Sequence, residues 1–236
     1  MKPTLNLLLA ATALCVAGTR STAADTVSAL YQFGVNTTTT YASTDADANS
    51  IASSITLGSG FTTSGISTTS GNPVPTLFLR PADNSIETNA FNGNKYIQFT
   101  ISGGTLSFSS LSFDFYRDTG ASAKFYALYF STTGSFTNGT HVDANATAFS
   151  PTATWTNYSV NLSDMPGLQS VAGTATFRLY FWGATDQTTP FRLDNLTLTT
   201  ASAAIPEPST YALVVSGCLL LVTLRRNHQH SKARSS

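Results

Sequence analysis

The sequence predicts an all-β fold, an antiparallel β-sandwich or jelly roll, for the central part of the chain. Apolar and aromatic residues alternate with polar ones in run after run, as expected for strands with one buried face. These runs are rich in β-branched and aromatic residues, and turns that contain Gly, Asn, Ser and Pro separate them. No helical periodicity of useful length interrupts them. Such spacing is typical of sandwiches and jelly rolls.

Six runs account for the expected strands in chain order. In four of them apolar residues share one face, and the run 124–130 carries aromatic residues on both faces, as in a strand buried between layers. The run 191–198 closes the domain. The runs are 96–101, 111–116, 124–130, 155–162, 176–182 and 191–198. The side chains expected to meet between the two sheets are Phe99, Phe113, Phe115, Leu128, Phe177, Leu179 and Phe181.

The segment 37–71 differs from these runs. It is dense in Thr, Ser, Gly, Asp and Ala, and its apolar residues are isolated. We expect short strands joined by long loops, and the segment is too apolar to be disordered.

The amino terminus has the features of a secretory signal peptide. Lys2 gives a positive start, residues 5–18 are mostly apolar, and Thr22-Ala23-Ala24 has the small residues of a signal-peptidase site. We therefore expect residues 1–24 to be a signal peptide and the mature chain to begin at Asp25.

The carboxyl terminus has three parts in a fixed order. Pro206-Glu207-Pro208 comes first, the apolar run 212–224 follows, and Arg225 and Arg226 come directly after it. The run is shorter than the about 20 residues of a comfortable helical span, but a short transmembrane helix could still cross a thin bilayer at some mismatch cost. The prolines prevent a helix from continuing upstream, so we expect this single apolar helix to begin just after them. The basic end favours a cytoplasmic carboxyl terminus. An ordinary single-span anchor is the alternative to a sorting signal.

This tail resembles the PEP-CTERM sorting signal of Gram-negative bacteria. The resemblance covers residues 205–226 and concerns the destination of the protein rather than its folded domain. It implies that a membrane-embedded exosortase recognises residues 205–236 and removes them. It also implies export to the cell envelope, the cell surface or the extracellular matrix, after transient anchoring in the inner membrane.

Residues 25–204 remain as one exported domain, and their charge limits what they bind. They contain six Lys/Arg and eleven Asp/Glu, a net charge of −5. A mildly acidic domain lacks the basic surface that nucleic acid or an anionic membrane requires. Both cysteines, Cys15 and Cys218, lie in the terminal apolar runs, so we expect neither a disulfide nor a thiolate metal site in the domain.

The second half of this domain resembles galactose-binding-like jelly rolls. Residues 129–136, which read Tyr-Phe-Ser-Thr-Thr-Gly-Ser-Phe, are similar to a strand and turn of that family. Residues 194–198, Asp-Asn-Leu-Thr-Leu, are similar to its closing strand. The resemblance spans about 95–200 and implies the fold. Thr133 stands where discoidin-type members usually have Asp, so it does not carry their ligand over.

The residues give little support to catalysis. The domain contains one histidine, His141, in a loop-like stretch, and one glutamate, Glu87. There is no Gly-x-Ser-x-Gly elbow for a serine hydrolase. A glycosidase needs two carboxylates at a defined separation, and no pair stands out. We therefore expect a protein that is not an enzyme.

Asp194 is the candidate for a structural calcium site. In many jelly-roll carbohydrate-binding modules the aspartate of the closing strand helps hold a calcium ion, which needs six to eight oxygen ligands. Asp45, Asp47 and Asp83 are candidate partners. The alternative is an aspartate that hydrogen-bonds nearby backbone and tethers the last strand. No other cofactor is expected.

Aromatic residues raise the question of sugar binding. Six of them could stack on a sugar ring: Tyr116, Tyr126, Trp155, Tyr158, Tyr180 and Trp182. Most of the six should lie in the core, because alternation explains them without a ligand. Trp182 is the best exception, because it ends a strand beside Gly183 and shares a face with Arg178 and Tyr180. If the domain binds sugar, we expect Trp182, Tyr180 and Arg178 to form the platform, and Trp182→Ala to leave the melting temperature nearly unchanged.

Together these observations predict an exported protein with a structural or adhesive role in the cell envelope or the extracellular polysaccharide of a biofilm. A carbohydrate-binding module of an exopolysaccharide-associated protein is the alternative. The expected partners are an exosortase, the membrane before processing, and extracellular polysaccharide.

Overall fold

A computed structural model describes residues 25–201, apart from 36–37, 45–46, 70, 82–85, 138, 146 and 150–151. The expected signal peptide (1–24) and sorting tail (205–236, with Pro206, Glu207, Pro208, Arg225 and Arg226) lie outside the described residues. Within the described ranges, no helix is both long enough and apolar enough to span a bilayer.

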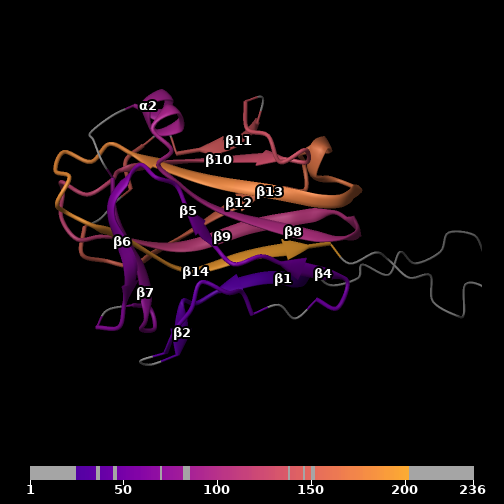
Figure 1. The fold of residues 1–236 in the computed structure, drawn as a ribbon, viewed down its shortest axis with the longest axis horizontal. Helices are drawn as coiled ribbons and strands as arrows, with labels where there is room; N and C mark the ends of the chain where they lie inside the picture. Colours follow the sequence, from indigo (N-terminus) through magenta and orange to yellow (C-terminus); the bar gives the residue numbers. More distant parts are fainter. Residues whose placement is uncertain are drawn as a thin grey trace, which may run out of the picture. The chain divides into compact units, whose positions relative to one another are not determined.

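Two β-sheets, each of six strands, carry the fold, and every strand pair is antiparallel (Figure 1). Sheet I has the order β12-β9-β14-β7-β6, and β1 also pairs with β14. Its strands are β1 (Thr26–Tyr31), β6 (Phe61–Ser67), β7 (Thr76–Pro81), β9 (Phe108–Arg117), β12 (Thr156–Asn161) and β14 (Phe191–Thr200).

Sheet II has the order β11-β10-β13-β8-β4, and β5 also pairs with β8. Its strands are β4 (Ser50–Ala52), β5 (Thr56–Leu57), β8 (Tyr96–Leu106), β10 (Phe125–Ser131), β11 (Thr140–Ala144) and β13 (Val171–Trp182). A two-stranded ribbon of β2 (Gly34–Val35) and β3 (Thr38–Thr39) stands apart. The predicted all-β sandwich is confirmed, and each of the six predicted runs coincides with a strand.

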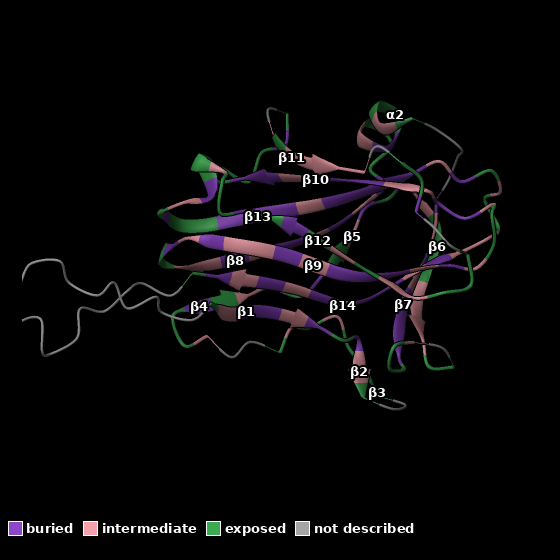
Figure 2. Cartoon of the chain, turned by 180° about the vertical axis from the view of Figure 1, so that it is seen from behind, coloured by how far each residue is buried: buried purple, intermediate pink, exposed green. Residues whose placement is uncertain are grey.

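The core lies between the sheets. All seven side chains that alternation assigns to it are at most 2% exposed, and they belong to one cluster. Rings from the two sheets meet directly: Phe115 of β9 lies 5.8 Å from Phe181 of β13, and Phe108 lies 5.2 Å from Phe177. Figure 2 shows the resulting alternation of buried and partly exposed residues along β9, β13 and β14. Burying each such ring contributes about 1.5–3 kcal/mol.

The segment 37–71 has the predicted character, since its described part contains the short strands β3, β4 and β5 and one longer strand, β6. Two short helices escape the sequence pattern: α2 (Glu87–Asn92) and the 3-10 helix η1 (Pro166–Leu168). Neither is long enough to show a helical period. Helix α2 has no side-chain N-cap, and Gly93 is its C-cap.

Candidate functional site

The outer face of sheet II carries the three residues predicted as a sugar platform. Arg178, Tyr180 and Trp182 share this face of β13, as alternation predicts. However, Tyr180 is 1% exposed and Trp182 is 9% exposed. Helix α2 packs beside β13 (Figure 1), and its Phe91 ring stacks 5.1 Å from the ring of Tyr180. Phe125 of β10 stacks on Trp182 at 5.7 Å.

Arg178 is held by the protein itself. Its guanidinium lies 3.9 Å from the ring centre of Tyr96 and 4.0 Å from that of Phe136. Its Nε donates to Oε1 of Gln98 at 2.7 Å. In this structure α2 and Phe125 therefore cover the rings, and the arginine already has its partners, so these three residues do not form an open platform; sugar binding through them stays a prediction. Trp182 is part of the packing, so its removal should lower stability.

The outer face of sheet I carries a second row of aromatic and basic side chains. Strand register places Tyr116 of β9 opposite Arg192 of β14, and Arg192 opposite Phe78 of β7. Trp155 precedes β12, whose Thr156 pairs with Phe115, so the indole lies beside Tyr116 with ring centres 5.2 Å apart. All four side chains of the row are partly exposed.

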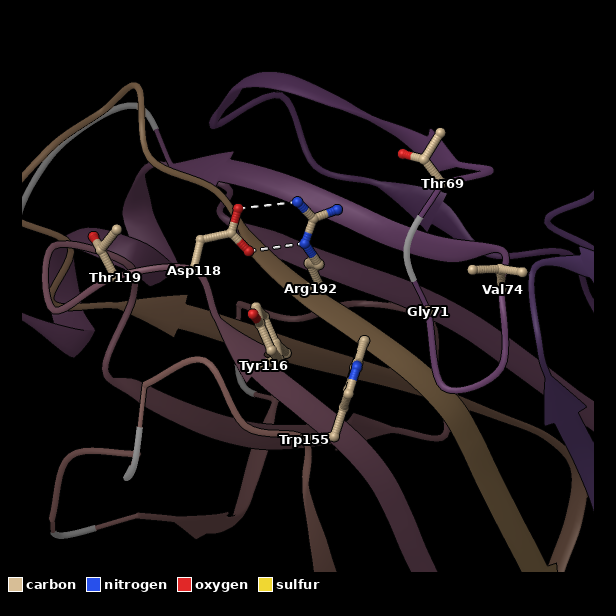
Figure 3. A pocket seen from close by; sticks show the side chains of 8 residues that line it. All are labelled: Thr69, Gly71, Val74, Tyr116, Asp118, Thr119, Trp155 and Arg192. Carbon is tan, nitrogen blue, oxygen red and sulfur yellow. Dashed lines mark hydrogen bonds and ion pairs between the residues drawn. The ribbon is translucent and has the colours of Figure 1, made fainter.

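A pocket of about 590 Å³ opens over three residues of this row, Tyr116, Trp155 and Arg192. Its floor comes from β9, β14 and the residue before β12, one side comes from the loop between β6 and β7, and the other from the turn after β9. Figure 3 shows Gly71 and Val74 on one side and Asp118 and Thr119 on the other. The lining residues are Thr69, Gly71, Val74, Tyr116, Asp118, Thr119, Trp155 and Arg192.

The polar group of the pocket is a bidentate ion pair, formed by two hydrogen bonds. Arg192 donates from Nε to Oδ1 of Asp118 at 2.8 Å and from Nη2 to Oδ2 at 3.0 Å (Figure 3). Such a fork fixes both side chains in orientation. The pocket thus combines aromatic surface with a rigid donor and acceptor pair whose charges compensate each other.

A network of carboxylates and amides tethers the loop that forms the pocket wall. The backbone N–H of Asn72 donates to Oδ2 of Asp194 at 2.7 Å, and its side-chain amide donates to Oδ2 of Asp114 at 3.1 Å. Asn157 donates to the other oxygen of Asp114 at 2.8 Å. The amide of Asn195, a residue with φ of 47° at a bulge in β14, donates to the carbonyl oxygen of Asn72 and to Asp114. The wall is therefore fixed to β9 and β14.

Asp194 is the buried centre of this network. It is 0% exposed, and burial together with the neighbouring Asp114 carboxylate raises its pKa to about 6, although two backbone N–H groups oppose the shift. These two bonds, from Asn72 and from Asn195 itself, match the tethering role that the sequence offers as the alternative to calcium.

Of the three candidate partners of Asp194 in a calcium site, the structure describes one, Asp47. The carboxylate of Asp47 accepts a hydrogen bond from the hydroxyl of Ser28 at 3.1 Å. Asp45 and Asp83 lie outside the described residues. In the described part of the chain, no three His, Cys, Asp or Glu side chains gather as a metal site would require. Calcium at Asp194 stays a prediction.

His141 lies in strand β11 of sheet II rather than in a loop, and it meets Glu87 of helix α2, which the sequence did not indicate. Oε1 of Glu87 lies 3.6 Å from Nε2 of His141 and accepts a hydrogen bond from Tyr129 at 2.8 Å. Burial, with help from Glu87, raises the pKa of Tyr129 to about 12. Neither residue lines the pocket over sheet I.

The sequence pattern did not predict the pocket, although it indicated that some of the lining residues leave the core. Alternation places Tyr116 on the polar side of its run, together with Ser112 and Asp114, and so away from the core. Trp155 stands at the start of its run. A shift of the strand start by one residue would move its side chain to the other face of the sheet, so the sequence alone does not settle its position. Asp118 and Arg192 gave no signal, because their pairing depends on strands far apart in the sequence.

The comparisons with known proteins give a likeness of fold. No family model and no curated protein matches the chain. Among solved structures, the CBM22-1 xylan-binding domain from Paenibacillus barcinonensis Xyn10C is 13% identical over 77% of this chain and 100% of its own, with a TM-score of 0.45. The K3 adhesin domain of Lys-gingipain from Porphyromonas gingivalis is 20% identical over 55% of this chain and 75% of its own, with a TM-score of 0.34.

A third similar structure is an enzyme. The Stig cyclase Fisc from Fischerella sp. TAU is 11% identical over 75% of this chain and 100% of its own, with a TM-score of 0.39. A binding module, an adhesin domain and a cyclase thus resemble the chain to comparable degrees. At these identities the likeness concerns β-sandwich architecture alone.

Proposed function

We propose that this chain is a non-catalytic carbohydrate-binding domain with an adhesive role, and that the glycan binds in the pocket over Tyr116 and Trp155. The observation that carries the proposal is the arrangement of two partly exposed rings beside a fixed arginine–aspartate pair in one open pocket. Ligand sites typically combine apolar and aromatic surface with a few polar groups that set orientation.

Each lining residue has a role in this proposal. The rings of Trp155 and Tyr116 offer flat apolar surface for the C–H face of a sugar ring, since both residues join an apolar body to a polar tip. Arg192 and Asp118 offer N–H donors and carboxylate acceptors to sugar hydroxyls. Thr69 and Thr119 add hydroxyls at the rim.

The same set of residues argues against hydrolysis. Asp118 is the one carboxylate among the residues that line the pocket, and Arg192 holds both of its oxygens. A glycosidase needs a second carboxylate and one group that carries a proton. Binding without turnover is what this lining supports.

The destination of the protein belongs to the proposal as well. The order Pro206-Glu207-Pro208, apolar run, Arg225-Arg226 supports sorting by an exosortase, and the amino-terminal pattern supports export. A glycan-binding domain delivered to the cell envelope would attach the cell, or the protein itself, to extracellular polysaccharide.

A glycan-array screen of the full-length protein tests the proposal, with a detergent that has no sugar headgroup to keep the apolar ends in solution. We expect retention on a subset of glycans, and loss of that retention in Trp155→Ala and Tyr116→Ala. Tyr96→Ala is the matched control, because it removes a partly exposed ring from the outer face of sheet II. Binding that survives both pocket variants, or no retention on any glycan, would refute the proposal.

A further inference from the structure

Beyond the pocket, a strip of uncharged side chains follows Trp155 along the edge of sheet I. β12 is the last strand of this sheet, and its outward residues Asn157, Ser159 and Asn161 follow Trp155 in the same alternation and are exposed. Consecutive outward side chains of a strand stand two residues apart, so Trp155 and Ser159 are separated by about 13 Å.

The neighbouring strand extends this strip inward. Ser159 lies opposite Ser112 of β9, and Ser112 lies opposite Thr197 of β14. Within the described residues, the hydroxyls of Ser112 and Ser159 have no hydrogen-bond partner, so they are available to a ligand. Asn157 uses its amide N–H for Asp114, which leaves its carbonyl oxygen as an acceptor.

The strip has an end and a side wall. Asn161 turns into the following loop, where it accepts two hydrogen bonds from Ser163 and donates one to Asp164 at 2.9 Å. Asn72 is bonded to Asp114 and Asp194 and therefore stands on this face next to β14. A ligand that leaves the pocket over sheet I is thus directed along β12 as far as Ser159.

The charges around this route select against an acidic ligand. Arg192 is already paired with Asp118. The carboxylates of Asp114 and Asp194 lie side by side just beneath this face. An anionic group placed over them meets like charge, which costs binding free energy. The domain as a whole is also acidic.

We propose that the ligand is an uncharged glycan chain, bound along its length from Trp155 to Ser159, rather than a single terminal sugar or an acidic polysaccharide. The inference rests on the proposed function of the pocket and specifies its ligand class. The hydroxyl and amide side chains of the strip match a neutral chain, whose hydroxyls are donors and acceptors in turn.

The experiment measures calorimetric affinities of the full-length protein for neutral gluco-, xylo- and galacto-oligosaccharides, from monosaccharide to hexasaccharide, and for oligogalacturonates of the same lengths. We expect affinity for at least one neutral series to rise about tenfold with length, or about 1.4 kcal/mol, and then to level off. The acidic series should bind at least about tenfold more weakly than the neutral one.

Two variants localise the effect. Ser159→Glu should remove the gain from added sugars and leave monosaccharide binding unchanged, because the residue is exposed and lies beyond the pocket. Thr105→Glu, at an exposed strand position of sheet II, is the matched control and should change neither.

The outcomes separate this inference from the function on which it rests. If Trp155→Ala abolishes binding but affinity is independent of chain length, or Ser159→Glu has no effect, the inference is wrong while the proposed function stands. Equal affinity for acidic chains also overturns it. If no glycan binds at all, the proposed function fails and the inference fails with it.

Discussion

The two outer faces of the sandwich start from similar side chains and end in different environments. Each carries an arginine beside a tyrosine and close to a tryptophan. On sheet II, helix α2 and the Phe136 ring cover this group. On sheet I, the corresponding group forms the floor of an open pocket. The groups are Arg178, Tyr180 and Trp182 on sheet II and Arg192, Tyr116 and Trp155 on sheet I. Strand alternation thus identifies the side chains that leave the core, but not whether another element covers them.

The cause of the difference is the position of the segment that crosses each face. Helix α2 places Ala90 and Phe91 directly on the rings of sheet II, where Ala90 joins a small cluster with Trp182 and Ala127. The loop on sheet I is instead held by hydrogen bonds from Asn72 to Asp194 and Asp114. It therefore stands beside Trp155 and Tyr116 as a wall and does not cover them.

The largest effect should come from the core that both faces share. Phe113→Ala beneath sheet I and Phe177→Ala beneath sheet II should each lower the free energy of unfolding by about 3–5 kcal/mol, because both rings are fully buried and leave a cavity. Urea denaturation measures both. A loss below about 1 kcal/mol at both sites would mean that the inward faces are wrongly assigned.

The two tryptophans should differ more sharply than any other pair. Trp182→Ala should cost about 2–4 kcal/mol, because the indole packs under α2 against Phe125. Trp155→Ala should cost about 1 kcal/mol or less, since it loses mainly its contact with Tyr116, yet it should abolish glycan retention. Thermal melts and glycan binding of both variants test this. A reversed order of stability losses would mean that the roles of the two faces are exchanged.

These variants also test how much of the fold can be predicted from the sequence alone. The period-two pattern was sufficient for the core, because the seven residues assigned to it are determined by local alternation and by the need to bury them. The same pattern placed Trp182 on the outer face of β13 correctly. It could not reveal α2, because that helix is too short to show a period and its contact with β13 is not local in the sequence.

The candidate site was harder to predict than the core, because it is built from residues that pair although they are far apart in the sequence. The Asp118–Arg192 fork and the tether of Asn72 to Asp194 each join residues far apart in the chain. No local spacing encodes such pairs. Asp194 was identified as a residue of structural importance, but whether a cation or backbone N–H groups surround it is decided by the loop that arrives from between β6 and β7.

An intermediate effect should follow from pH at the wall of the pocket. The pKa of Asp194 is raised to about 6, so the folded state binds this proton more tightly than the unfolded chain does. Stability should therefore rise as pH falls through about 6, by about 1 kcal/mol between about pH 7.5 and pH 5. The carboxyls with lowered pKa values, Asp47 and Asp186, act in the opposite direction only at lower pH.

Urea denaturation at the two pH values measures this effect, with Asp194→Asn as the control that should flatten the dependence. No element of sheet II should take part, since the raised pKa comes from burial and from Asp114 in sheet I. An unchanged pH dependence in the variant would assign the effect to another group.

The smallest effects should distinguish the two arginines. Arg178→Lys removes the planar guanidinium that lies between Tyr96 and Phe136, together with its hydrogen bond to Gln98. The free energy of unfolding should therefore fall by about 0.5–1 kcal/mol. Arg192→Lys breaks a two-point ion pair at a partly exposed site, so stability should change by less than about 0.5 kcal/mol. Glycan affinity should nevertheless fall several-fold in the second variant alone, because an ammonium group cannot hold both oxygens of Asp118 and still present a fixed donor to the ligand. Paired denaturation and binding measurements decide the matter: if Arg178→Lys weakens binding as much as Arg192→Lys does, the covered face of sheet II takes part in recognition after all.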